Sequence, residues 1–204
     1  MSARDDVLAA VRTALGPDRP ERRPRVARPH PAPGATAPAD RAALVDLFAE
    51  RVADYRASVT RCRPAEVEAA VAAALDDATR VLVPDGLFLD LPHTVLPGDL
   101  TTEGLDGVDA VVTTATLGIA ETGTIVFTHG PGQGRRALTL VPDHHVCVVT
   151  ADQVVPDVPH AIAALDPLRP QTWVSGPSAT SDIELDRVEG VHGPRRLDVV
   201  VVDG

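Results

Sequence analysis

Residues 197–202 read Leu-Asp-Val-Val-Val-Val, and residues 146–149 read Val-Cys-Val-Val. Both runs are apolar at nearly every position rather than at alternate positions. A strand with this pattern is covered on both of its faces, as in a parallel sheet that carries helices on its two sides. The two runs therefore predict an α/β domain built on a largely parallel sheet.

Shorter runs and helical segments extend this prediction along the chain. Apolar residues at helical spacing between Leu44 and Tyr55 follow Asp40, a suitable N-cap, and a second helix is predicted to begin near Pro64. The other predicted strands are 80–83, 110–113, 123–127 and 172–174. The segments predicted as helices between strands are 158–165 and 181–189.

The first forty residues differ from the remainder of the chain. Residues 1–16 have apolar residues at helical spacing and predict a short helix that stops at a Gly-Pro pair. Residues 17–39 are rich in Pro and Arg and predict an extended linker, so the α/β domain is assigned to residues 40–204. Residues 1–40 hold seven arginines against five acidic residues, so a weakly basic arm precedes an acidic body.

Composition excludes several classes of function. The net charge of −10 argues against binding to nucleic acid or to an anionic membrane surface. The chain has no lysine, which excludes a Schiff-base lysine and a P-loop lysine. The N-terminus has no apolar core of a signal peptide, and no window reaches the length of a membrane span, so we expect a cytoplasmic protein.

Metal and redox sites are not expected in this chain. Its two cysteines, Cys62 and Cys147, lie far apart in the sequence and cannot by themselves hold an iron–sulfur cluster or a zinc ion. The adjacent His144 and His145 are predicted to point to opposite faces of a strand, so they cannot easily bind one metal ion. The prediction is no metal and no cofactor in this chain.

Three turns carry residues that suit chemistry, and each lies at a junction where α/β sheets usually place ligands. The first turn, residues 118–124, holds Glu121 between two glycines. A carboxylate in that setting is a candidate base, acid or nucleophile. The alternative interpretation is a tight turn in which Glu121 caps backbone N–H groups.

The second turn, residues 175–184, follows a predicted strand and contains Gly176-Pro177-Ser178. Its hydroxyl and N–H groups suit a phosphate or a carboxylate, although Asp182 would oppose a nearby anion. Ser181 and Glu184 match a capping box, so a purely structural cap is the alternative.

The third turn, residues 190–196, precedes the last predicted strand. Gly190 is placed as a helix C-cap and His192 lies between turn residues. His192 is a candidate general acid or base, and the alternative is a histidine that hydrogen-bonds local carbonyl groups.

These turns resemble a known family. The segments GIAETGTIVF (118–127), RRALTLVPDHHVCVV (135–149) and SGPSATSDIELDRVEGVHGPRRLDVVVVD (175–203) are similar to the LUD domain of the lactate-utilisation C proteins, also called YkgG-like and formerly a domain of unknown function. The similarity extends over about residues 40–204 and is close over 116–204. The motif residues that it carries over are Glu121, Thr122, Gly123, Gly176, Pro177, Ser178, Asp182, Ile183, Glu184, Gly190, His192, Gly193 and Pro194.

The resemblance implies a fold and a function. It implies a Rossmann-like α/β layer of the sugar-phosphate isomerase and CoA-transferase superfamily. It also implies a subunit that supports oxidation of L-lactate to pyruvate with two iron–sulfur partner proteins and holds no redox centre itself. The resemblance identifies the turns and not the roles of their residues; from the turns themselves, and by fold-level analogy for Glu121, we expect Glu121 and His192 as catalytic residues. The residues expected to bind a small carboxylate are Thr122, Gly123, Gly176, Pro177, Ser178, Asp182, Gly190 and Gly193.

Two other interpretations stay open at this point. By analogy with CoA transferases, the chain is a stand-alone isomerase or acyl/CoA transferase in which Glu121 is the nucleophile or base and His192 assists. Alternatively, it is a binding or regulatory module whose arm, residues 17–39, recruits a partner.

Overall fold

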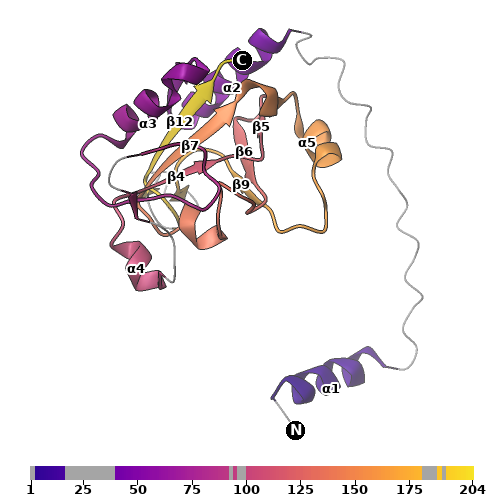
Figure 1. Ribbon diagram of the computed structural model, residues 1–204. Coiled ribbons are helices and arrows are strands. Elements are labelled where there is room, and N and C mark those ends of the chain that lie inside the picture. The colour runs from indigo at the N-terminus through magenta and orange to yellow at the C-terminus, as the bar shows by residue number, and fades with distance from the viewer. Residues whose placement is uncertain (1–2, 17–39, 92–93, 96–99, 181–187, 190–191) are drawn as a thin grey trace. The chain divides into compact units, whose positions relative to one another are not determined.

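The computed structural model describes residues 3–16, 40–91, 94–95, 100–180, 188–189 and 192–204 (Figure 1). The chain divides into a small N-terminal unit and a large unit. The N-terminal unit contains α1 (Ala3–Leu15), which matches the helix predicted from the sequence and has no buried residue. The predicted linker 17–39 lies outside the described residues.

A six-stranded parallel sheet forms the centre of the large unit. Every pair of neighbouring strands in it is parallel, as the unbroken apolar runs predicted. In spatial order the strands are β1 (Ser58–Cys62), β12 (Arg196–Val202), β7 (His144–Thr150), β4 (Ala110–Thr114), β2 (Val81–Leu82) and β3 (Thr94–Val95).

Helices cover both faces of this sheet. On one face, α3 (Val67–Leu75), preceded by the 3₁₀ turn η1 (Pro64–Glu66), packs on the even-numbered residues of β7 and β12. On the other face, α2 (Arg41–Asp54) packs on the odd-numbered residues. Asp40 caps α2 as predicted, because its carboxylate accepts the N–H of Ala42 at 3.3 Å. This two-sided cover is the physical reason for the continuous apolar runs, and the arrangement is a Rossmann-like layered α/β fold.

A second sheet lies on the same side as α2. Its strand order is β8 (Val154–Val155), β5 (Leu117–Ile119), β6 (Thr124–Phe127) and β9 (Thr172–Val174). Because β6 is antiparallel to both β5 and β9, the strands predicted at 123–127 and 172–174 lie in a second sheet, apart from the parallel one. One side of the second sheet packs on the main sheet and the other side packs on α5 (Val158–Ala164). An apolar run covered on both sides in this way does not reveal the direction of its neighbours.

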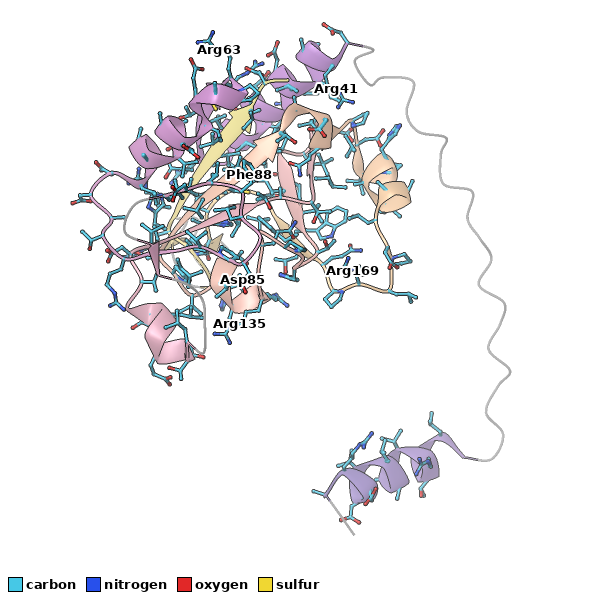
Figure 2. The ribbon with its side chains drawn as sticks, viewed as in Figure 1. Arg41, Arg63, Asp85, Phe88, Arg135 and Arg169 are labelled. Atoms are coloured by element: carbon cyan, nitrogen blue, oxygen red, sulfur yellow. The ribbon has the colours of Figure 1, made fainter. Side chains whose placement is uncertain are left out.

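Side-chain contacts join α2 to the segment that follows β7. Arg41, labelled in Figure 2, donates hydrogen bonds to the carbonyl oxygens of Ala151 at 3.2 Å and Val154 at 2.6 Å. These carbonyls belong to the 3₁₀ turn η3 (Ala151–Gln153) and to the first residue of β8. These hydrogen bonds therefore fix the start of α2 to η3 and to the start of β8.

Short elements complete the large unit. They are α4 (Thr102–Asp106), the 3₁₀ turn η2 (Arg136–Thr139), and an antiparallel pair of β10 (Ala179–Thr180) and β11 (Val188–Glu189). Residues 188–189 pair with β10, so the predicted helix 181–189 was wrong at its end, and residues 181–187 lie outside the described part. Among the residues that the structure describes, no helix is long and apolar enough to cross a membrane.

Candidate functional site

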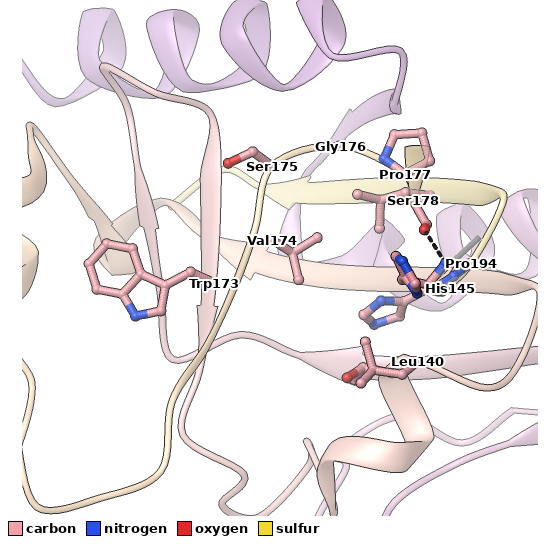
Figure 3. A pocket seen from close by; sticks show the side chains of 13 residues that line it. Leu140, His145, Trp173, Val174, Ser175, Gly176, Pro177, Ser178 and Pro194 are labelled. Atoms are coloured by element: carbon pink, nitrogen blue, oxygen red, sulfur yellow. Dashed lines mark hydrogen bonds between the residues drawn. The ribbon is translucent and has the colours of Figure 1, made fainter. Parts of the chain in front are cut away.

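A cavity of about 260 Å³ lies between the second and third turns (Figure 3). We call it the turn cavity. The residues that line it are Thr139, Leu140, His145, Trp173, Val174, Ser175, Gly176, Pro177, Ser178, His192, Gly193, Pro194 and Leu197. It lies where β9 ends and where β7 and β12 begin. Ligands of α/β sheets are usually found at the carboxyl ends of the strands. The structure instead places these turns at the amino ends of two central parallel strands.

Ser178 joins the second turn to the third. Its backbone N–H donates to the carbonyl oxygen of Pro194 at 2.8 Å. Its hydroxyl oxygen accepts the backbone N–H of His192 at 3.1 Å, the dashed line in Figure 3. The two turns thus form one wall of the cavity, to which Gly176, Pro177, Ser178, His192 and Gly193 contribute.

The glycines of the first and second turns pack against the C-terminal end of α2. Gly123 has φ +59°, and a Cβ there would lie 2.6 Å from the carbonyl carbon of Arg51. Gly176 has φ +76°, and a Cβ there would lie 2.5 Å from the carbonyl oxygen of Tyr55. Both positions exclude side chains because of α2, which gives these motif glycines a structural role.

A chain of hydroxyl groups connects the first turn to the cavity wall. The Oγ1 atoms of Thr122 and Thr124 are 2.7 Å apart, and that of Thr124 is 2.8 Å from the Oγ of Ser175. Thr122 itself does not line the cavity, but Ser175 does. The first turn therefore orients the Ser175 hydroxyl rather than forming the wall.

His145 forms the buried end of the cavity. Its Nε2 lies 2.7 Å from the hydroxyl of Thr113, and its ring lies 5.6 Å from that of Phe127, centroid to centroid. Burial, together with the nearby His144, lowers the pKa of His145 to about 3, so the ring is neutral. Sequence reasoning did not assign His145 to a site; the signal that could have done so was its position at the start of an apolar strand.

His144 points to the opposite face of the sheet, as predicted from strand alternation. Its Nε2 lies 2.6 Å from Asp198, which also accepts a hydrogen bond from Nε of Arg196 at 2.8 Å. Burial tends to raise the pKa of Asp198, but the hydrogen bond from His144 and the charge of Arg196 together lower it. This buried cluster is structural and does not reach the turn cavity.

Among the residues that the structure describes, the wall of the turn cavity carries no Asp, Glu or Arg side chain. Its polar groups are hydroxyls, imidazoles and backbone amides. Arg195, which directly follows the lining residue Pro194, binds Asp143 through two guanidinium nitrogens. This contact lowers the pKa of the Asp143 carboxyl. The cavity therefore offers a ligand hydrogen bonds from hydroxyl, imidazole and backbone groups.

The remaining predicted site residues lie elsewhere. Glu121 is exposed, its backbone N–H donates to the carbonyl oxygen of Pro156 at 3.0 Å, and it does not line the turn cavity. Asp182 and Gly190 lie outside the described residues. The catalytic roles expected for Glu121 and His192 stay predictions.

Comparison with known proteins identifies the family. The model of the LUD domain matches residues 88–202. Lactate utilization protein C of Deinococcus radiodurans is 46% identical over 98% of this chain and 95% of its own length. Lactate utilization protein C of Halalkalibacterium halodurans is 33% identical over 52% of this chain and 49% of its own length.

A solved structure agrees with these relatives. The crystal structure of a DUF162 family protein from Deinococcus radiodurans superposes with a TM-score of 0.69 at 39% identity, covering 81% of this chain and 99% of that one. The resemblance noted in the three turns is thus confirmed over almost the whole sequence. The chain belongs to the LUD domain family, together with the lactate utilization C proteins that it resembles.

Proposed function

We propose that this chain supports the oxidation of L-lactate to pyruvate as a component without a redox centre, and that iron–sulfur partner proteins carry the electrons. The observation that carries the proposal is the 46% identity, over 98% of the chain, to a lactate utilization protein C. That identity supports a role in lactate utilisation, and the partnership with iron–sulfur proteins is a further step of the proposal.

The chemistry of the two cysteines supports the need for partners. Removal of two electrons from lactate requires an acceptor, and iron–sulfur clusters are held by several thiolates. Cys62 and Cys147 are both buried and pack on opposite faces of the main sheet. Burial raises the pKa of Cys147 to about 12, which keeps it a thiol.

The turn cavity is the proposed binding site for the small carboxylate. The hydroxyls of Ser175 and Ser178 and the side chain of His192 supply hydrogen-bond donors along one wall. Neutral His145 closes the buried end without adding a charge. A carboxylate that accepts hydrogen bonds from such groups is held in one orientation.

Growth on L-lactate tests this proposal. The host is a Deinococcus radiodurans strain from which the gene for the 46% identical relative has been deleted, and its growth on L-lactate is measured with and without the added gene. We expect the wild-type chain to restore growth and Ser178→Ala to restore it poorly. Ser58→Ala, at an exposed serine of β1, is the matched control and should behave as wild type.

Two results would contradict the proposal. Failure of the wild-type chain, despite soluble expression, would remove the role in lactate use. Normal growth with Ser178→Ala and with Ser175→Ala would leave the role intact but would remove the turn cavity as its site.

A further inference from the structure

A second cavity, of about 580 Å³, lies at the carboxyl edge of the parallel sheet. We call it the loop cavity. Its lining residues are Pro84, Asp85, Gly86, Gly130, Pro131, Gly134, Arg135 and Leu138. Pro84, Asp85 and Gly86 follow β2. The glycine-rich loop 130–134 is held at the end of β4, because the N–H of Thr114 donates to the carbonyl oxygen of Gly132 at 2.8 Å. This edge is where open α/β sheets bind ligands.

The two loops that form this cavity are locked together without a ligand. The N–H of Gly132 donates to the carbonyl oxygen of Asp85 at 2.8 Å. The side-chain oxygen of the buried Gln133 accepts the N–H groups of Thr128 at 2.9 Å and His129 at 3.0 Å. The cavity is therefore preformed, which lowers the entropic cost of binding.

The glycine-rich loop is not a phosphate cradle. Phosphate-binding loops of this kind point several free backbone N–H groups at the ligand. Here the N–H groups of Gln133 and Gly134 both donate to the carbonyl oxygen of Gly130, at 3.1 and 3.2 Å. With the N–H of Gly132 also engaged, recognition of an anion depends on a side chain.

Arg135 is that side chain. Its guanidinium donates to the carbonyl oxygen of Leu100, which orients it while most of its five N–H donors remain for other partners. Within the described part of the chain no carboxylate pairs with Arg135, whereas Arg61, Arg63 and Arg195 each have one. An oriented arginine that forms no ion pair with the described residues, on the wall of a cavity, suits a planar carboxylate.

Asp85 supplies the second polar group. It is exposed, and among the described residues its carboxylate has no ion pair. It lines the same cavity as Arg135, and both residues are labelled in Figure 2. The other lining side chains, from Pro84, Pro131 and Leu138, are apolar. The cavity thus offers a cation, an anion and an apolar wall.

We propose that the loop cavity binds a small organic acid that carries a hydrogen-bond donor beside its carboxylate, that is, a 2-hydroxy acid or a 2-amino acid. The carboxylate binds Arg135, and the hydroxyl or ammonium group donates to Asp85. The remaining carbon chain packs on the prolines and Leu138. This site is separate from the turn cavity and does not depend on the role proposed above.

Two-dimensional NMR of the amide groups of the full chain tests the proposal with three acids of equal carbon number. The acids are L-lactate, L-alanine and propionate, of which propionate lacks the donor. The amides of Gly86 and Gly130 report on the loop cavity, and that of Gly193 reports on the turn cavity. We expect L-lactate or L-alanine to shift the Gly86 and Gly130 signals at concentrations about tenfold lower than propionate does. The stronger of the two identifies the class of acid.

Matched variants complete the experiment. Arg135→Gln should weaken the loop-cavity response to every acid by about tenfold or more, while Arg136→Gln, at the neighbouring exposed arginine outside the cavity, should not. Asp85→Asn should remove the advantage over propionate. The proposal is overturned if propionate binds equally well, if Arg135→Gln keeps the response, or if only Gly193 shifts. The last result would leave the turn-cavity assignment untouched.

Discussion

Replacing Gly123 by alanine should destabilise the chain although the residue does not line the turn cavity. A Cβ at this position would lie 2.6 Å from the carbonyl carbon of Arg51 and 2.7 Å from the nitrogen of Val52. Both atoms are backbone atoms of α2, so they cannot rotate away. In addition, φ is +59°, a conformation that L-residues rarely adopt.

The two effects set the expected size. The left-handed conformation costs about 1–2 kcal/mol for a residue with a Cβ. Overpacking in a tight contact typically costs about 1–3 kcal/mol more. The sum, about 2–5 kcal/mol, is a large part of the stability of a domain. For a chain of this length it corresponds to a fall in Tm of roughly 5 to 20 °C.

Thermal unfolding followed by circular dichroism measures this loss. Gly193→Ala is the matched control, because its Cβ would meet nothing closer than the Cβ of Ser178, at 3.4 Å. Gly193→Ala should change stability by less than about 0.5 kcal/mol. An unchanged Tm in Gly123→Ala would refute the structural role of the motif glycine.

The remaining predictions concern acid stability, the first turn and the hydroxyl chain. The pKa of His145 is lowered to about 3, so the unfolded chain gains a proton as pH falls below about 6.5 and stability is lost at up to about 1.4 kcal/mol per pH unit. Denaturant unfolding at pH 7 and pH 5 should show that His145→Gln loses less stability on acidification than wild type; equal losses would refute this. Glu121→Gln should support growth on L-lactate like wild type, because Glu121 does not line the turn cavity; loss of growth with unchanged folding would favour the transferase-like interpretation. Thr124→Val should reduce that growth by freeing the Ser175 hydroxyl, and normal growth would show that the chain of hydroxyls has no role.

The central strands could be predicted because burial on both faces requires apolar residues at nearly every position. The apolar runs in β7 and β12 identified these strands and the class of fold. β1, in contrast, has mostly exposed residues and reads as polar, since it lies at the edge of the sheet. The same apolar pattern in β6 could not reveal that this strand belongs to a second sheet, in which both of its neighbours are antiparallel to it. Local pattern reports burial, and strand direction depends on distant partners.

The site was predictable to a similar extent. The second and third turns were identified by their Gly, Pro, Ser and His residues, and the structure joins them through Ser178. Gly123 and Gly176 pack against the end of α2, which is distant from them in the sequence. The sequence therefore singled out both glycines but could not show why these positions exclude a side chain. Glu121 was predicted as a catalytic residue because it lies between two glycines. Its position relative to the turn cavity depends on how the second sheet packs, which the local sequence does not show.

Formation of pyruvate from L-lactate in a cell extract tests the central claim most directly. The extract comes from the Deinococcus strain that lacks its own lactate utilization protein C, and the purified chain is added back. We predict that pyruvate formation is restored by the wild-type chain, that it depends on the extract, and that the purified chain alone forms none. Pyruvate formation by the purified chain without extract, or no restoration at any concentration of added chain, would contradict the account.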